Sequence, residues 1–278
     1  MALPHALAII ERGVLPALRR AKRYAGEKGR IATMPELVSA RVHSVPGAWD
    51  TWFTTSTSLY FGRSMLGNPI IIIAHGTGLL MYEEDCKQAY EYTAVCRNNQ
   101  KYGTIGRDEF YKLEAGRCGD VIVIDAKPYM STRSELMGCL ESQFTINKSS
   151  HSDMLMKAIF GPDWQTYILN FQRQAADAGI GVSDPNRLGE LRLQWEFTHD
   201  VCWANFLSFE LTNAGASLSA KDDSVRFVAI RDGEPIRKIV EKPQLKKLVE
   251  RVKETQSAFD KLRSDVEILH AMDAEEVL

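Results

Sequence analysis

Apolar residues follow two different periods along the chain, and the change of period predicts where strands and helices lie. Residues 69–74 include four successive isoleucines, which is typical of a strand buried on both faces of a sheet. Residues 121–124 have the same character and end at Asp125. A helix is expected between them, over residues 82–97. The two runs therefore predict neighbouring, fully buried strands of a small mixed sheet.

The N-terminal part predicts a basic helix followed by strands. Its first 30 residues hold seven Lys or Arg against two Glu, and apolar residues recur at helical spacing at Leu7, Ile10, Val14 and Leu18. Residues 38–42 and 52–60 are rich in β-branched and aromatic side chains, which predicts strands. The basic segment is expected to cap the domain with a solvated face, and contact with an anionic surface is the alternative.

The middle of the chain is predicted to be mostly helical. A helix over residues 132–144 would open with the capping-box pattern Thr132-x-x-Glu135, and a second is expected over residues 163–178. A longer helix is expected after Pro185, with a strand over residues 204–212 as the alternative. Residues 225–230 and 236–240, joined by an Asp-Gly turn, predict a β-hairpin.

The C-terminal segment has the most regular pattern. From Leu245 to Leu269, apolar residues are spaced alternately three and four positions apart, with Thr255 as the exception. We therefore expect one α+β domain over residues 1–242 and a C-terminal helical arm over residues 243–278. The predicted fold is α+β, with helices packed on a small mixed sheet, a basic N-terminal helix and a long amphipathic C-terminal helix. Because an apolar stripe must be buried, this arm is expected to form a coiled coil in a homo-oligomer, and packing against the domain's own helices is the alternative.

Composition and charge narrow the class of protein. The 278 residues are 45% hydrophobic and 25% charged, as in soluble globular proteins with a sizeable core. The net charge of −2 shows no basic excess, so nucleic-acid binding is not expected. The five cysteines form no zinc-site pattern and no disulfide framework, which favours a cytoplasmic location. The longest uncharged run, residues 64–82, contains turn-forming residues, so no membrane span is expected.

The most specific local pattern is His75-Gly76-Thr77-Gly78, directly after the isoleucine run. Glycines let backbone N–H groups approach a ligand, and the N-terminus of a following helix attracts anions. We therefore expect a phosphate or oxyanion site, held by Thr77 and the two glycine amides. His75 would act as an acid, base or ligand donor, and Asp125 would lie at the same sheet edge. The alternative is a structural turn whose histidine bonds to the backbone.

A second, less specific pattern consists of two Glu-x-x-His pairs, Glu196–His199 and Glu267–His270. On a helix, this spacing places both side chains on one face, as in dimetal carboxylate proteins. Glu196, His199 and Asp200 are expected to form a buried polar cluster. A metal-binding protein is a remote alternative, and no metal ligand or cofactor is assigned.

Two classes of function follow from these patterns. The first is a small-ligand-binding protein, which would extend to an enzyme, with its site at the loop that begins at His75. The second is a non-enzymatic assembly protein that uses its C-terminal helix. The test between them is whether His75, Thr77 and Asp125 converge in a concave pocket.

Overall fold

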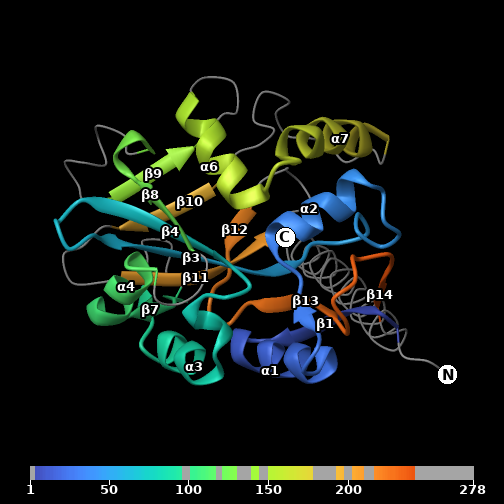
Figure 1. The fold of residues 1–278 in the computed structure, drawn as a ribbon, viewed down its shortest axis with the longest axis horizontal. Coiled ribbons are helices and arrows are strands. Elements are labelled where there is room, and N and C mark those ends of the chain that lie inside the picture. Colours follow the sequence, from blue (N-terminus) through green and yellow to red (C-terminus); the bar gives the residue numbers. More distant parts are fainter. Residues whose placement is uncertain are drawn as a thin grey trace, which may run out of the picture. The chain divides into compact units, whose positions relative to one another are not determined.

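The structure is a computed structural model that describes residues 4–95, 101–116, 121–129, 139–143, 150–177, 192–196, 202–209 and 216–241. The chain divides into two compact units, residues 1–240 and 241–278, and the following description concerns the first. In its described residues, six α-helices accompany a ten-stranded mixed sheet (Figure 1). The predicted class, α+β with helices on a mixed sheet, is confirmed, but the sheet is large rather than small.

The sheet has a main path of six strands and four further strands beside it. The main path is β12 (Ala216–Leu218), β11 (Cys202–Phe209), β3 (Thr54–Arg63), β13 (Ser224–Ile230), β1 (Ala6–Arg12) and β14 (Ile239–Glu241). Beside it, β4 (Pro69–His75) pairs with β3 and with β8 (Val121–Asp125), β2 (Arg30–Ile31) pairs with β13, and β7 (Thr104–Ile105) pairs with β11. Two separate two-stranded sheets are β9 (Cys139–Gln143) with β10 (Arg192–Glu196), and β5 (Ala94–Val95) with β6 (Lys101–Tyr102).

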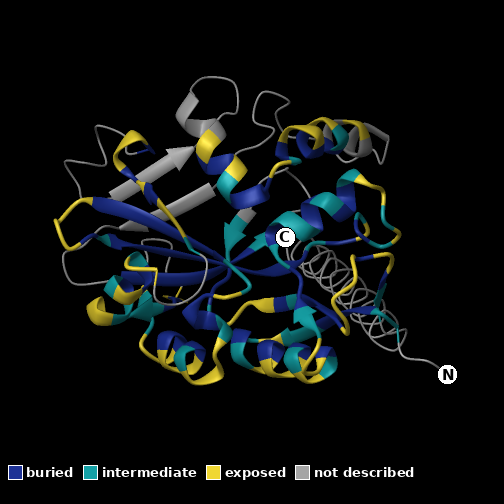
Figure 2. Cartoon of the chain, viewed as in Figure 1, coloured by how far each residue is buried: buried dark blue, intermediate teal, exposed yellow. Residues whose placement is uncertain are grey.

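Helices cover both faces of the large sheet and enclose two apolar cores. One core includes residues of α2 (Met34–Val42), α6 (Ser150–Phe160) and α7 (Trp164–Asp177). The other includes residues of α1 (Val14–Ala25), α3 (Glu83–Glu91) and α4 (Arg107–Glu114). Figure 2 shows the central strands buried between these helix layers, with exposed residues on the outward sides of the helices. This arrangement explains the long apolar runs, because the central strands are buried on both faces.

The large sheet divides at β3. One edge of β3 pairs with β11, whereas the other lies beside β13 at Thr54 and beside β4 from Thr57 onward. Ala32 lies between the two diverging partners. Its N–H donates to the carbonyl oxygen of Val228 on β13, and its own carbonyl accepts from the N–H of Ser56 on β3, each at 2.8 Å. The division of the sheet therefore brings the β2–α2 connection next to the end of β4.

Residues 38–42 belong to helix α2, so the predicted strand is wrong. Thr33 Oγ1 accepts from the N–H of Glu36, and the Glu36 carboxylate accepts from the N–H of Thr33. This is a capping box, and Pro35 adds a preferred residue in the first turn. These start signals outweigh the β propensity of Val38 and Val42.

At the two ends of the domain, long-range pairing overrides the local patterns. The predicted N-terminal helix begins only at Val14, because residues 6–12 form β1 between β13 and β14. The same insertion contradicts the predicted hairpin, since β1 separates the strands at 224–230 and 239–241 in the sheet order. β8 is likewise not fully buried, because it borders the sheet beside β4 and exposes 40% of Ile122 and 43% of Val123.

The middle of the chain is partly as predicted. α7 confirms the helix expected over residues 163–178. The long helix expected after Pro185 is wrong, since β10 and β11 occupy residues 192–196 and 202–209, and strand was the correct alternative near residue 204. β9 contradicts the helical end expected at residues 139–143.

The C-terminal apolar stripe lies outside the described residues, and self-association through it stays a prediction. No helix in the described ranges combines the length and the hydropathy that a bilayer crossing requires.

Candidate functional site

His75 ends β4 and Asp125 ends β8, and the two residues were expected to lie at the same sheet edge. The strands are neighbours, as predicted, but they are antiparallel, with Ile70 opposite Asp125 and Ala74 opposite Val121. Asp125 is therefore displaced by five residues along β4 from His75, which corresponds to about 17 Å of strand. The prediction that His75 and Asp125 share one sheet edge is wrong.

The His75 ring is hydrogen-bonded at both nitrogens. Its Nε2 lies 2.8 Å from the carbonyl oxygen of Ala158 on α6, and this oxygen can only accept, so Nε2 carries the hydrogen. Its Nδ1 lies 2.8 Å from Thr57 Oγ1, which also accepts from the N–H of Met34 at 2.9 Å. In the neutral ring, which burial favours, the hydroxyl of Thr57 donates to Nδ1. His75 is a neutral link between β4, β3 and α6, as in the alternative of a structural turn.

Burial gives His75 a pH-dependent effect on stability. Desolvation lowers the pKa of His75, against smaller raising effects of the Ala158 carbonyl and the Glu36 carboxylate. The unfolded chain therefore binds a proton at this histidine more readily than the folded chain does. The stabilisation is complete above the pKa of an unfolded histidine, about 6.5, and is lost as pH falls through the lower folded value.

We therefore expect His75→Gln to remove part of the acid sensitivity. Urea unfolding of both proteins at pH 8 sets the reference difference in free energy, because histidine is neutral there in both states. As pH falls from 7 to 5, the wild type should lose stability relative to the variant. Stability curves that remain parallel over this range would contradict the assignment.

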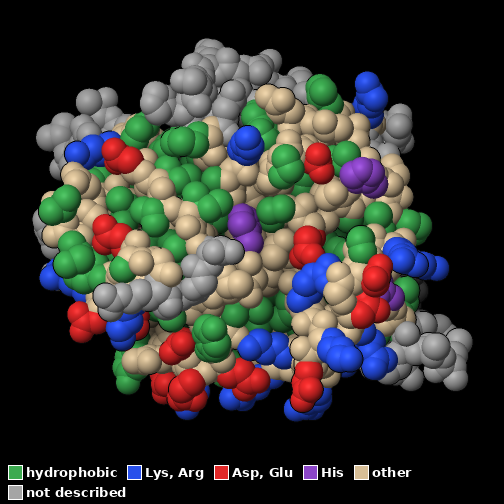
Figure 3. All heavy atoms as spheres, in the orientation of Figure 1, with side chains coloured by type: hydrophobic (Ala, Val, Ile, Leu, Met, Phe, Trp, Pro, Cys, Tyr) green, Lys and Arg blue, Asp and Glu red, His purple; other side chains and the backbone are tan. Residues whose placement is uncertain are grey.

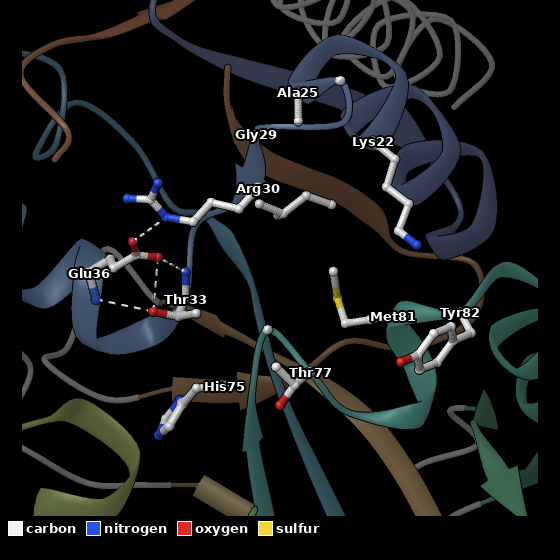
Figure 4. Close-up of a pocket in the computed structure, with 13 residues that line it drawn as sticks. Lys22, Ala25, Gly29, Arg30, Thr33, Glu36, His75, Thr77, Met81 and Tyr82 are labelled. Atoms are coloured by element: carbon white, nitrogen blue, oxygen red, sulfur yellow. Dashed lines mark hydrogen bonds and ion pairs between the residues drawn. The ribbon is translucent and has the colours of Figure 1, made fainter. Parts of the chain in front are cut away.

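A cavity of about 650 Å³ opens beside His75 (Figure 4). Its walls come from the C-terminal end of α1, from β2, from the first turn of α2 and from the loop between β4 and α3. The polar side chains in this lining are Lys22, Arg30, Thr33, Glu36, His75, Thr77 and Tyr82. Of the predicted site, His75, Gly76 and Thr77 lie here, whereas Gly78 and Asp125 are not in the lining.

Both glycines of the predicted loop have roles within the fold. Gly76 has φ of +76°, which favours glycine, and its N–H donates to the carbonyl oxygen of Ser56 at 3.1 Å. A Cβ atom on Gly78 would lie 2.4 Å from the Tyr60 hydroxyl oxygen. The Gly76 amide is thus already engaged, and Gly78 is needed for close packing.

Arg30 forms one wall of the cavity with its charge already compensated. Its Nε donates to Glu36 Oε1 at 2.6 Å, and its Nη1 and Nη2 donate to the carbonyl oxygens of Asp232 and Glu234 at 2.9 and 3.1 Å. The other oxygen of Glu36 accepts from the N–H of Thr33 at 2.9 Å. This network holds the wall rigid and leaves Arg30 with no spare charge for a ligand.

Lys22 is the cation of the lining whose charge is not compensated. It lies in the last turn of α1 and is half-buried, with Nζ 6.0 Å from the centre of the Tyr82 ring. It has no ion pair within the part of the chain that the structure describes. Figure 4 shows Lys22, Met81 and Tyr82 on one side of the cavity and Arg30 with Glu36 on the other. The lining therefore carries a single net positive charge next to an aromatic ring.

The remaining basic residues of α1 do not form a cationic surface. Arg19 Nε lies 2.9 Å from a carboxylate oxygen of Glu83, and Arg20 is paired with Glu11. In Figure 3, Lys and Arg side chains alternate with Asp and Glu along the side of α1 and α3. The basic N-terminal segment is thus a solvated face on which Arg19 and Arg20 are charge-paired.

The predicted polar cluster and the remote alternative of a metal site receive no support from the described residues. Glu196 ends strand β10, opposite Cys139, so it is not on a helix. His199, Asp200, Glu267 and His270 lie outside the described residues, within which no group of His, Cys, Asp or Glu is placed to hold a metal. Burial raises the pKa of Cys86 to about 12 and that of Cys202 to about 11. These two thiols are therefore protonated at neutral pH and are not nucleophiles.

Sequence reasoning identified only His75, Gly76 and Thr77 of the thirteen lining residues. The capping pattern Thr33-x-x-Glu36 was a usable signal for the first turn of α2, and the basic N-terminal segment pointed to the region of Lys22. Nothing local indicated that Arg30 would be neutralised or that Tyr82 would face Lys22, because both facts depend on tertiary pairing.

No model of a known protein family matches this sequence, and no curated protein matches it. This chain is similar to a solved structure from a study of how the C-type lectin fold accommodates massive sequence variation in Nanoarchaeota. The match covers 81% of this chain and 97% of that one, with a TM-score of 0.54 and 19% sequence identity. At this identity the likeness concerns the fold alone: this chain is similar in architecture to a protein with the C-type lectin fold.

Proposed function

We propose that this chain is a non-catalytic binding protein for a small organic anion. The ligand would occupy the cavity between α1, β2, the first turn of α2 and the loop after β4. The observation that carries this proposal is the uncompensated charge of Lys22 on a half-buried wall of a cavity of about 650 Å³. Cavities of this size are typical of small-molecule sites.

Binding fits the site better than catalysis. A general base needs a free lone pair beside the substrate, and both nitrogens of His75 are engaged. Glu36 is paired with Arg30 and capped by Thr33. The described lining thus offers a charge and hydroxyl groups for recognition, but no free acid and base in reach of each other.

The structural neighbour supports a binding role by analogy of fold. Its C-type lectin fold accommodates massive sequence variation, which fits a rigid scaffold on which side chains determine the ligand. In this chain, hydrogen bonds to the sheet anchor elements around the cavity. Ala32 bonds to two strands, and Gly76 bonds to β3.

The proposal is tested by NMR of protein labelled with ¹³C at the methionine methyl groups. Met81 lines the cavity, whereas Met65 is exposed on the turn between β3 and β4 and serves as the remote reporter. A panel of small carboxylic acids, alcohols and amines should contain compounds that shift the Met81 signal and leave Met65 unchanged. A panel that leaves Met81 unchanged at millimolar concentrations would refute a binding cavity.

Replacing Lys22 by methionine should weaken binding of the acids about tenfold or more, because a half-buried charge–charge contact is worth at least ~1.4 kcal/mol. Methionine retains helix propensity and the apolar stem. Arg23→Met is the matched control, since Arg23 lies in the same turn of α1, is exposed and is not in the lining. Equal losses in both variants would show a general charge effect and would contradict a specific role of Lys22.

A further inference from the structure

We propose that the ligand of this cavity carries one negative charge on a flat apolar body, as an aromatic monocarboxylate does, and not a phosphate. This inference rests on the proposed function and specifies its ligand. The carboxylate would bind Lys22 and the hydroxyl groups of Thr77 and Tyr82. The body would lie over Met81 and Ile31.

The charge of the lining sets the charge of the ligand. Its charged side chains are Lys22, Arg30 and Glu36, and the contact of 2.6 Å between the last two closes one ion pair. Burial, together with a Thr57 hydroxyl that can donate to Nδ1, favours the neutral form of the His75 ring. One positive charge remains, which a monoanion compensates. A dianion would carry one negative charge that no charged side chain of the lining compensates.

The backbone next to Lys22 also opposes a phosphate. Ala25 and Gly26, at the C-terminal end of α1, belong to the lining. The carbonyl end of a helix carries a partial negative charge, whereas phosphate sites use the N–H groups of helix N-termini. The N–H of Gly76 is engaged with Ser56. The partial negative charge repels a dianion more strongly than a monoanion, so a monoanion takes the place of the phosphate predicted for the loop at His75.

The apolar part of the lining suits a flat body. Ile31 and Met81 provide aliphatic contact, and Gly26, Gly29 and Gly76 leave the walls without side chains. Tyr82 is 58% exposed, so its ring is accessible for stacking. Figure 4 shows the Met81 side chain beside Lys22 and Tyr82, which places the flexible thioether next to the proposed carboxylate position.

Two hydroxyl groups complete the recognition of a carboxylate. Thr77 and Tyr82 line the cavity and are exposed. Within the described residues, neither hydroxyl has a hydrogen-bond partner, so both remain able to donate. Lys22 with two hydroxyl donors matches a carboxylate, whose two oxygens accept several hydrogen bonds.

Four probes of similar shape test this inference: benzoate, benzyl alcohol, benzylamine and phenyl phosphate. Each is titrated at pH 8, where the phosphate ester is a dianion, and the Met81 methyl signal is followed. Benzoate should bind at least about tenfold more tightly than benzyl alcohol and several-fold more tightly than phenyl phosphate. Lys22→Met should abolish the preference for benzoate over the alcohol, and Thr77→Val and Tyr82→Phe should each reduce it.

The outcomes separate the ligand class from the function. Equal binding of benzoate and benzyl alcohol, or tighter binding of benzylamine, overturns the monoanion and leaves a binding cavity. Tighter binding of phenyl phosphate overturns the inference in favour of a phosphate site. A Met81 signal that none of the four probes shifts, but that other acids of the panel shift, overturns the aromatic monocarboxylate. A Met81 signal that no compound of the panel shifts overturns the proposed function itself.

Discussion

Replacing Arg41 by methionine is expected to lower the free energy of unfolding by about 3–5 kcal/mol. Arg41 is 1% exposed. Its Nε donates to the Ala48 carbonyl at 2.9 Å, and its Nη1 and Nη2 donate to the Tyr167 hydroxyl and the Thr51 carbonyl, each at 3.0 Å. Methionine fills much of the volume, but it leaves three buried acceptors without donors, and each of these costs about 1–3 kcal/mol.

Aromatic rings take the place of a counter-ion for this guanidinium. Its Cζ lies 4.4 Å from the ring centre of Phe209 and 4.9 Å from that of Trp49, and the described residues hold no ion pair of Arg41. Arg41→Lys should therefore also be strongly destabilised, because an ammonium group neither stacks nor spans three acceptors. Tyr167→Phe removes one acceptor and should cost about 1 kcal/mol in urea unfolding. If Arg41→Lys unfolded at the same urea concentration as the wild type, this account would be contradicted.

Gly29→Ala is the second substitution with a large expected effect, about 2–3 kcal/mol. A Cβ atom at this position would lie 2.2 Å from the carbonyl oxygen of Ile230 and 2.3 Å from that of Ala25. Both are backbone atoms, so relief requires the end of α1 to move away from β13. The melting temperature and the Met81 methyl signal should both change, because Gly29 also lines the cavity.

Gly233→Ala is the matched control for this substitution. No heavy atom lies within 4 Å of a Cβ atom built there, and its melting temperature should stay close to that of the wild type. Equal melting temperatures of the Gly29→Ala and Gly233→Ala variants would contradict the close approach of α1 to β13.

The sequence predicted elements whose signals are local. The isoleucine run gives β4, the stripe from Trp164 to Phe171 gives α7, and the adjacency of β4 and β8 is correct. β11 was misread because it is buried on both faces, which removes the alternation that marks a strand. The segment of α2 was predicted as a strand because of its β-branched residues Val38 and Val42. The capping-box pattern of Thr33 and Glu36 is visible in the sequence and indicates the helix that forms.

The candidate site was predictable only where one segment supplies it. His75, Gly76 and Thr77 follow one another, and a His-Gly pattern after a buried strand is visible in the sequence. Lys22 and Arg30 reach the cavity because β2 pairs with β13 and Ala32 bonds to both β13 and β3. The side of the His75 ring that carries the hydrogen depends on Ala158, which lies 83 positions away. Such distant partners leave no local pattern.

The insertion of β1 between β13 and β14 affects how the protein folds during translation. Ile9 lies opposite Phe227, so more than two hundred residues must be translated before β1 meets its first long partner. At about 5–20 residues per second, this interval lasts roughly 10–45 s. Throughout it, an apolar strand with two open edges is exposed to other nascent chains. Yield during overexpression should therefore depend on chaperone capacity, and refolding should be most efficient at high dilution.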